Sequence, residues 1–225
     1  GLFDFSGEVY EALSVADAAV IVINGKSGVE VGTRRSFDFC AKKGIPVIVY
    51  ITCVEDEHVD ASVIVDELRE SYGNKIVPFH MPMKEDGVFK GFINAVKMLE
   101  CRLQPNGSYD EVVVEEGVND ELDDYRMQLM EGVAETSEDL MEKFFAEEPF
   151  TEDEIKNAII GSVAKRDLMP VICGAINTDY GANILLNDMV KYFSAPGMVT
   201  DQFTGTKVKT GEPVTASYDA SQPVS

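Results

Sequence analysis

The chain has 225 residues, of which 45% are hydrophobic, and 40 acidic residues outnumber 19 basic ones to give a formal charge of −21. This hydrophobic content predicts a packed globular core, and the length suits one domain or one domain with a large insert. The charge argues against independent nucleic-acid binding, because a phosphate backbone is bound by clustered Lys and Arg. It is compatible with a basic protein partner and equally with solubility alone.

Four cysteines, Cys40, Cys53, Cys101 and Cys173, lie far apart in the sequence and form no CxxC pair. Together with the two histidines they show no metal-ligand spacing, so no metal site is expected in this chain. Buried free thiols in a reducing cytosol are the expected state, which predicts a cytoplasmic protein. No apolar run approaches the ~18 residues that would indicate a membrane span.

The first part of the chain alternates between helix-like and strand-like patterns, and it begins with a helix that Ser6 is placed to cap. Two unbroken apolar runs, at 18–23 and 46–51, fit parallel strands that are buried on both faces. Further helices are predicted at 31–43 and 59–71. The apolar positions of the three helices are Val9, Leu13, Ala16, Phe37, Cys40, Ala41, Val63, Ile64, Leu68 and Tyr72.

The pattern changes between about 75 and 166, where most of the negative charge also lies. Three strands are predicted at 75–83, 91–99 and 109–115, followed by helices at about 119–134 and 137–146 and by a third helix that opens with the capping box Thr151–Glu154. Strands followed by helices, without alternation, indicate a small α+β subdomain inserted at 76–165.

The alternating pattern resumes with an apolar run at 169–176 and a helix at 182–193. The β-α-β-α order predicts an α/β fold with a doubly wound, mostly parallel sheet, formed by 1–75 and 166–197. The remaining residues, 198–225, are polar and lack helical periodicity, which indicates a linker toward a second domain that the sequence does not contain.

The stretch NGKSG at 24–28 follows a strand and resembles the end of a phosphate-binding P-loop. The full motif needs a glycine five positions before Gly25, so that backbone N–H groups can surround the phosphates. Val20 occupies that position, and no helical pattern follows at once. A tight turn is therefore the better interpretation.

The N-terminal stretch GLFDFSGEVYEAL resembles the switch II region of translational GTPases, D-T-P-G-H-x-D-F-x-G-E-V, entered at its glycine. The resemblance continues through ALSVADAAVIVINGKSGVEVGT, the strand at 46–51, the insert stretches PFHMPM, FKGFINAVKM, VAETSEDLMEKFF and FTEDEIKNAI, and PVICGAINTDYGANILLNDMVKYFSAP. The chain is thus similar to part of elongation factor G or of a divergent paralogue. This resemblance implies a truncated P-loop GTPase-type fold with a G-prime-like insert, running from the switch II glycine to just before domain II.

The resemblance assigns the first two residues to the γ-phosphate side of the nucleotide site. Gly1 takes the place of the glycine whose N–H binds the γ-phosphate. Leu2 replaces the family histidine that positions the attacking water, and its side chain can neither donate nor accept a hydrogen bond. No catalytic residue is therefore expected in this chain. The family's P-loop, switch I and Mg²⁺-holding Asp are expected before Gly1, so GTP turnover by this segment alone is not expected.

The resemblance also aligns Thr52, Cys53 and Glu55 with the guanine-reading motif N-K-x-D. The family Asp accepts two hydrogen bonds from guanine, the Asn ties the loop to the base and the P-loop, and the Lys stem covers the ring. Thr lacks the paired donor and acceptor of an amide, Cys cannot cover a base, and Glu sets its carboxylate one methylene further out. The family's last base-contacting loop aligns with Gly174, Ala175 and Ile176, where a backbone N–H near Ala175 is a candidate contact to a base oxygen and a simple strand-to-helix turn is the alternative.

For the whole protein the resemblance implies GTP and Mg²⁺ as cofactors and the ribosome as partner, with tight binding of neither cofactor to this chain alone. Exposed acids of the insert, such as Glu121, Asp124, Glu131 and Glu135, suit the basic surface of the ribosomal stalk protein, or they form only a solvated face. Two functions stay open. The whole protein is a GTP-dependent switch in translation, or it is a non-hydrolysing, ribosome-associated regulatory paralogue with a degenerate nucleotide site. A Rossmann-type oxidoreductase is disfavoured because no GxGxxG follows a strand.

Overall fold

The computed structural model describes residues 3–104, 108–175, 178, 180–195 and 202–217. The chain divides into two compact units, Gly1–Phe193 and Ser194–Ser225, which are described separately. Within the described residues no helix is long and apolar enough to cross a membrane.

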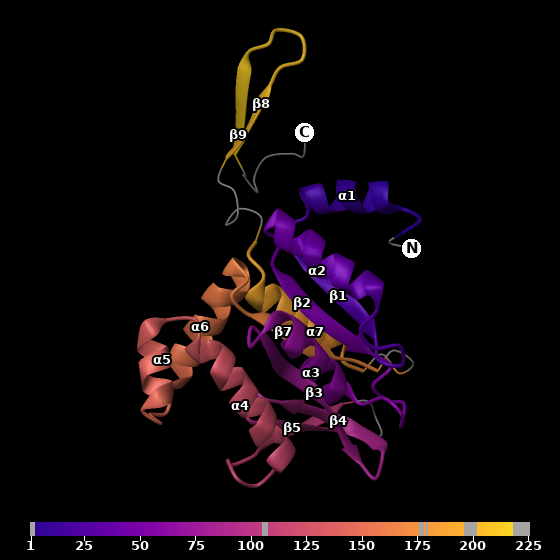
Figure 1. Ribbon diagram of the computed structural model, residues 1–225, viewed down its shortest axis with the longest axis vertical. Coiled ribbons are helices and arrows are strands. Elements are labelled where there is room, and N and C mark those ends of the chain that lie inside the picture. The colour runs from indigo at the N-terminus through magenta and orange to yellow at the C-terminus, as the bar shows by residue number, and fades with distance from the viewer. Residues whose placement is uncertain (1–2, 105–107, 176–177, 179, 196–201, 218–225) are drawn as a thin grey trace. The chain divides into compact units, whose positions relative to one another are not determined.

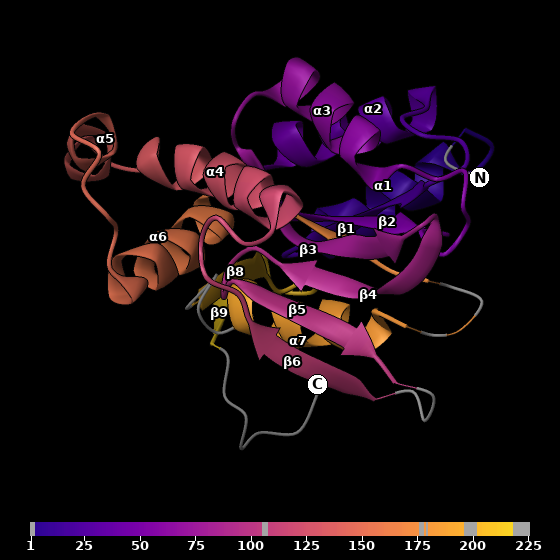
Figure 2. The same ribbon diagram turned by 90° about the horizontal axis from the view of Figure 1, so that it is seen from below.

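A seven-stranded sheet with the order β1-β2-β7-β3-β4-β5-β6 forms the centre of the first unit (Figure 2). Its first four strands are β1 (Ala19–Asn24), β2 (Val47–Thr52), β7 (Met169–Cys173) and β3 (Ile76–Glu85), and each runs parallel to its neighbour. The predicted α/β fold class is confirmed. The strands at 46–51 and 169–173 form because their continuous apolar side chains are buried on both faces. The run at 18–23 also forms a strand, but the expected burial on both faces was wrong there, because β1 lies at the edge of the sheet and Val22 is 60% exposed.

The last three strands, β4 (Val88–Asn94), β5 (Leu99–Leu103) and β6 (Tyr109–Val113), are antiparallel and extend the same sheet beyond β3. The prediction of one strand over 91–99 was wrong, because the chain turns after Asn94. The Asn94 side-chain oxygen accepts hydrogen bonds from the backbone N–H groups of Val96 and Lys97, and Met98 has a left-handed φ of 54°. An Asx turn of this kind closes a hairpin without glycine.

Seven helices are described: α1 (Ser6–Val15), α2 (Val31–Lys43), α3 (Ala61–Tyr72), α4 (Asp120–Ala134), α5 (Glu138–Phe145), α6 (Glu152–Lys165) and α7 (Ala182–Tyr192). Figure 2 shows α2 and α3 on one face of the sheet and α7 on the other, as a doubly wound sheet requires. The capping box at Thr151 and Glu154 is confirmed, with reciprocal hydrogen bonds of 3.2 and 2.9 Å. The Ser6 cap was wrong, since Ser6 is the first residue of α1 and Phe5, which has no capping oxygen, precedes it.

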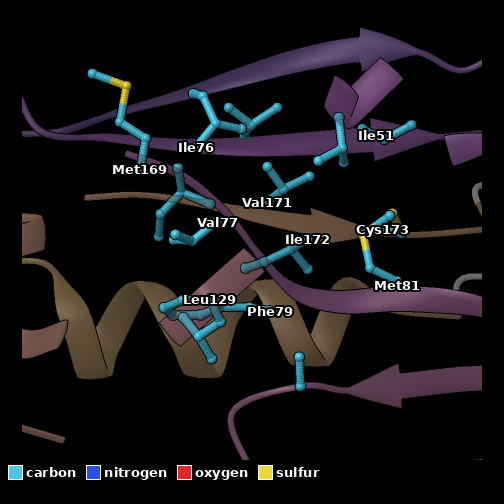
Figure 3. Close-up of a cluster of buried hydrophobic side chains, with 14 of the residues drawn as sticks. Ile51, Ile76, Val77, Phe79, Met81, Leu129, Met169, Val171, Ile172 and Cys173 are labelled. Atoms are coloured by element: carbon cyan, nitrogen blue, oxygen red, sulfur yellow. The ribbon is translucent and has the colours of Figure 1, made fainter. Parts of the chain in front are cut away.

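The core lies between β2, β7, β3 and the helices that cover them (Figure 3). Every residue of β2 is buried, and Phe79 of β3 makes an edge contact with Tyr192 of α7 at 5.2 Å between ring centroids. Val63, which was expected on the apolar face of its helix, is instead 60% exposed. In α3 the buried stripe is Ala61, Ile64, Val65 and Leu68, so Val63 lies outside the arc that a helix turns toward a sheet.

Arg69 of α3 ties the helices of the first 75 residues to the insert. Its guanidinium donates to the backbone oxygen of Ile76 at 2.9 Å, to Asn74 at 2.9 Å and to the Glu131 carboxylate at 2.5 Å. Glu135 also accepts a hydrogen bond from Asn74 at 2.8 Å. Glu131, one of the acids expected on an exposed face, is thus paired with a guanidinium of the same chain.

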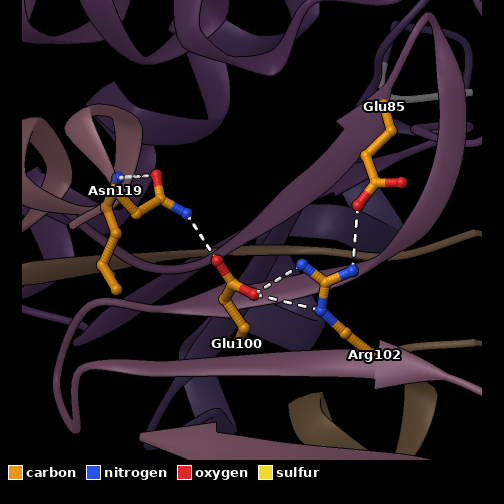
Figure 4. Close-up of polar contacts among 5 residues, drawn as sticks. Glu85, Glu100, Arg102 and Asn119 are labelled. Carbon is orange, nitrogen blue, oxygen red and sulfur yellow. Dashed lines mark hydrogen bonds and ion pairs between the residues drawn. The ribbon is translucent and has the colours of Figure 1, made fainter. Parts of the chain in front are cut away.

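A second polar cluster fixes the start of α4 on the antiparallel strands (Figure 4). Arg102 of β5 bridges Glu85 and Glu100, each at 2.9 Å, and Asn119 donates to Glu100 at 2.7 Å. Asn119 also caps α4 by accepting from the Leu122 N–H. One cluster thus joins the hairpin of the insert to its first helix.

The second unit contains a hairpin of two antiparallel strands, β8 (Gln202–Thr206) and β9 (Pro213–Ser217). Lys207 and Glu212 form an ion pair of 3.1 Å across its turn. The segment predicted as a linker therefore has secondary structure of its own.

Candidate functional site

The carboxyl ends of β1, β2 and β7 lie side by side at one edge of the sheet. Asn24 is in register with Thr52, and Ile51 is in register with Cys173. Three loops leave the sheet here, and they lead to α2, α3 and α7. In open α/β sheets ligands bind in the crevice outside this edge, so the loops after β2 and β7 are the candidate site.

Thr52 ends β2 and points toward β1, away from the loop surface. Its side chain is 3% exposed, and its hydroxyl donates to the Ile23 backbone oxygen at 3.3 Å. Cys53 follows with a left-handed φ of 62°, which turns the chain away from the strand direction. The Cys53 carbonyl then accepts from the Asp56 N–H at 3.2 Å, which closes a tight turn.

Glu55 lies in this turn, is partly buried, and is close to the side chain of Tyr50. Burial, the neighbouring Cys173 and the Glu55 carboxylate together raise the pKa of Tyr50 above its usual value. The Glu55 carboxylate thus lies near the end of β2, where its charge acts on both Tyr50 and Lys26.

The loop after β7 contacts the loop after β2 directly. Gly174 donates to the Ile51 oxygen at 2.8 Å, and its own oxygen accepts from the Val54 N–H at 3.5 Å. Ala175 is fully buried, and its N–H donates to the Tyr180 oxygen at 2.8 Å. The structure therefore brings Thr52, Cys53 and Glu55 together with Gly174 and Ala175. The Ala175 N–H is occupied within the protein and is not free to meet a base oxygen.

Three further positions, Gly1, Leu2 and Ile176, lie outside the described residues, so their expected roles at the nucleotide stay predictions.

Lys26 and Asp56 join the turn after β1 to the turn after β2, a contact that the sequence did not indicate. Their charged atoms are 2.5 Å apart. The Lys26 ammonium, followed by the His58 backbone N–H, lowers the pKa of Asp56. The Lys26 side chain is exposed, and that of Asp56 is partly buried. NGKSG itself forms the predicted turn, with the Asn24 oxygen accepting from the N–H groups of Ser27 and Gly28. Its lysine thus contacts a carboxylate and does not stand in a phosphate-binding loop.

Lys84 of β3 holds the same loop from the side of the insert. Its ammonium donates to the backbone oxygens of Asp56 and Val59, each at 2.6 Å. The sequence also did not indicate that Tyr50 belongs to this site, because Tyr50 stands within an apolar run. In the structure its hydroxyl lies against Gly174. A tyrosine among buried aliphatic residues, whose hydroxyl needs a polar neighbour, was the one signal present in the sequence.

The described residues do not reproduce a guanine-reading set. The Thr52 hydroxyl and the Ala175 N–H are both engaged within the protein, and no lysine follows Thr52. Of that set, Glu55 keeps a carboxylate, the chemical group that accepts from guanine in the aligned motif. Among the described residues no group of three His, Cys, Asp or Glu side chains is placed to hold a metal ion.

Comparison with known proteins identifies a matching family and a similar solved structure. The family described as the elongation factor Tu GTP-binding domain matches residues 1–195. Among solved structures, the crystal structure of a protein from Thermus thermophilus superposes with a TM-score of 0.77 at 27% sequence identity. The match covers 89% of this chain and 30% of that protein, so the chain spans about a third of its length.

Because the family match covers residues 1–195 and the strand order places its loops at one ligand-binding edge, the chain belongs to the elongation factor Tu GTP-binding domain family of translational GTPases.

Proposed function

We propose that the chain is part of an elongation factor G-like translation factor, which acts in the cytoplasm as a GTP-dependent switch on the ribosome. The observation that carries the proposal is the direct contact between the loops after β2 and β7, through the Val54 N–H and the Gly174 oxygen. These are the two loops that resemble the base-reading loops of the family. The insert at 76–165, which resembles that of elongation factor G, supports this choice within the family.

In this proposal the 225-residue chain does not hydrolyse GTP by itself. Its sequence contains no GxxxxGK[ST] motif, and Leu2 stands where the family has the water-positioning histidine. GTP and Mg²⁺ are cofactors of the whole protein only, with the phosphate groups held by a part of the protein outside this sequence.

A second function is favoured by the loop geometry. The buried Thr52 hydroxyl and the occupied Ala175 N–H leave few groups for a guanine edge. Sites built to pair a ring edge depend on such buried polar groups for selectivity. In this alternative the whole protein is a ribosome-associated regulatory paralogue that keeps the fold and has lost hydrolysis.

Calorimetric titration of the whole protein with GTP and with ATP distinguishes the two functions. The switch predicts a Kd for GTP below about 1 µM with clear selectivity over ATP. The regulatory paralogue predicts weak binding without selectivity. A separate hydrolysis assay on the 225-residue chain is expected to show no turnover, and measurable turnover there would contradict the assignment of the phosphate-binding half to another part of the protein.

For the partner, we infer that the insert meets the basic surface of the ribosomal stalk protein. Figure 1 shows α5 at the outer end of the insert, far from β1. Glu138, Asp139 and Glu142 of this helix are exposed, and none forms an ion pair among the described residues. Acids of this kind attract a basic partner and act mainly on the association rate.

Changing Glu138, Asp139 and Glu142 to glutamine is expected to slow association with purified stalk protein by about tenfold at low salt. Surface plasmon resonance measures this rate. Asp38, Asp66 and Glu70 on α2 and α3 are also exposed and offer a control triple with the same charge change. Equal slowing by both triples would show that net charge alone acts, and would contradict a stalk contact on α5.

A further inference from the structure

A cavity of about 660 Å³ opens where the β4–β5 turn, α4, α6 and α7 meet. It lies apart from the candidate nucleotide site, since none of its lining residues belongs to the loops after β2 or β7. Its volume falls within the range of about 300–1,000 Å³ that is usual for small-molecule sites.

Four cations line this cavity: Lys97, Arg126, Lys156 and Lys191. A cluster of four cations is unexpected in a chain that has 40 acidic and only 19 basic residues. Across the described part of the chain, none of the four has a carboxylate within 4 Å. Their positive charge is therefore not neutralised by a direct ion pair.

Arg126 is the innermost of these cations and is held by the fold. One guanidinium nitrogen donates to the backbone oxygens of Ala95 and Val96, at 2.9 and 3.0 Å. Burial lowers the pKa of Arg126, while Glu116 and Glu152 act in the opposite direction. An anchored guanidinium of this kind presents its remaining N–H groups in a fixed direction.

Lys191 experiences the charges of its neighbours across the cavity. Burial lowers the pKa of Lys191, and the positive charges of Lys97 and Lys156 lower it further, with Asp188 opposing. The Lys191 ammonium also donates to the Tyr192 hydroxyl at 2.7 Å and lies 4.6 Å from the centre of that ring. Three lysines from three elements thus repel one another over a common space.

The walls between the cations are apolar. Leu99, Ile155, Ile159 and Tyr192 line the cavity and are each less than 9% exposed, and Met98 and Val113 complete its apolar surface. Two acids, Glu152 and Asp153, lie at the α6 end. Four positive and two negative charges leave the lining with a net charge of +2, close to the charge of about −2 on a phosphate group.

We propose that this cavity binds a small organic phosphate that carries an apolar or aromatic body. The phosphate neutralises the lysines and Arg126, and the body contacts the apolar walls. Lysine ammonium groups act as point charges toward phosphate, and hydrogen bonds between charged groups are the strong ones. A ligand with only one of the two parts leaves either the cations or the walls without a partner.

The test uses 1-naphthyl phosphate as probe, added to the 225-residue chain with methyl groups labelled for NMR. The expected result is saturable shifts of the Met98, Leu99, Ile155 and Ile159 methyl signals. Inorganic phosphate alone and 1-naphthol alone are each expected to bind about tenfold more weakly, because each makes only part of the contacts. Absence of saturation up to solubility, or shifts spread over the molecule, would overturn the proposal.

Two pairs of variants distinguish specific binding in the cavity from general attraction of anions to positive charge. The double variant Lys156→Gln and Lys191→Gln is expected to weaken binding of 1-naphthyl phosphate about tenfold. Lys42→Gln with Lys165→Gln removes the same charge from positions outside the cavity, Lys165 being on the same helix as Lys156. This control pair is expected to change the affinity less than about twofold. Equal weakening by the two pairs would also overturn the proposal.

Discussion

Replacing Gly174 by alanine is expected to lower the free energy of unfolding by about 3 kcal/mol. A β-carbon at this position would overlap both the Tyr50 hydroxyl and the ring carbons next to it. Neither side has room to move. Tyr50 is 9% exposed within the fully buried strand β2, and Gly174 is held by its hydrogen bonds to Ile51 and Val54.

Urea unfolding measures this loss, and Gly161→Ala serves as its control. Gly161 lies in α6 with nothing within 4 Å of an added β-carbon. Alanine there is expected to raise stability by about 0.5–1 kcal/mol, because it favours the helix over the unfolded chain. In a double-mutant cycle, Tyr50→Leu should remove part of the cost of Gly174→Ala, since the two residues are in contact. A neutral Gly174→Ala would mean that the two loops do not approach as described.

The parallel strands β1, β2 and β7 were predictable because each corresponds to a continuous apolar run in the sequence. The run at 46–51 contains only apolar residues, which is typical of a strand that is covered on both faces. The break inside 91–99 was not predicted, because one asparagine side chain sets it and the flanking residues are all compatible with a strand. The Ser6 cap failed for a similar reason, since a one-residue shift of a helix start removes the cap.

At the candidate site, the resemblance located the loops and the structure supplied what surrounds them. Thr52, Glu55 and Gly174 meet because neighbouring parallel strands end at one edge. The partners that hold these loops, Lys26 and Lys84, come from other parts of the chain and act through single contacts. Nothing in their local sequence distinguishes them from solvated lysines, so only the tertiary structure reveals them.

Restoring Thr52→Asn, Cys53→Lys and Glu55→Asp in the whole protein is expected to tighten GTP binding about tenfold or more. Hydrogen bonds to a charged group contribute about 1.5–3 kcal/mol each, and a shorter carboxylate reaches both guanine donors from this turn. The buried position 52 constrains the first change, because an asparagine amide must keep the bond to the Ile23 oxygen. At position 53 the left-handed backbone is already strained for cysteine, so lysine adds little further strain.

Calorimetry with GTP and with ATP on the triple variant measures this effect, and ATP affinity is expected to stay unchanged because adenine lacks the paired donors. A lysine at position 53 would both cover the base and add a positive charge. Cys53→Met in place of Cys53→Lys separates these two effects, since methionine covers a ring without adding a charge. Glu55→Asp alone is expected to produce part of the gain, because it shortens the one carboxylate of the aligned set. If GTP affinity does not change while thermal unfolding shows the triple variant to be folded, then Thr52, Cys53 and Glu55 do not read the base. The nucleotide would then have to be recognised by another part of the whole protein.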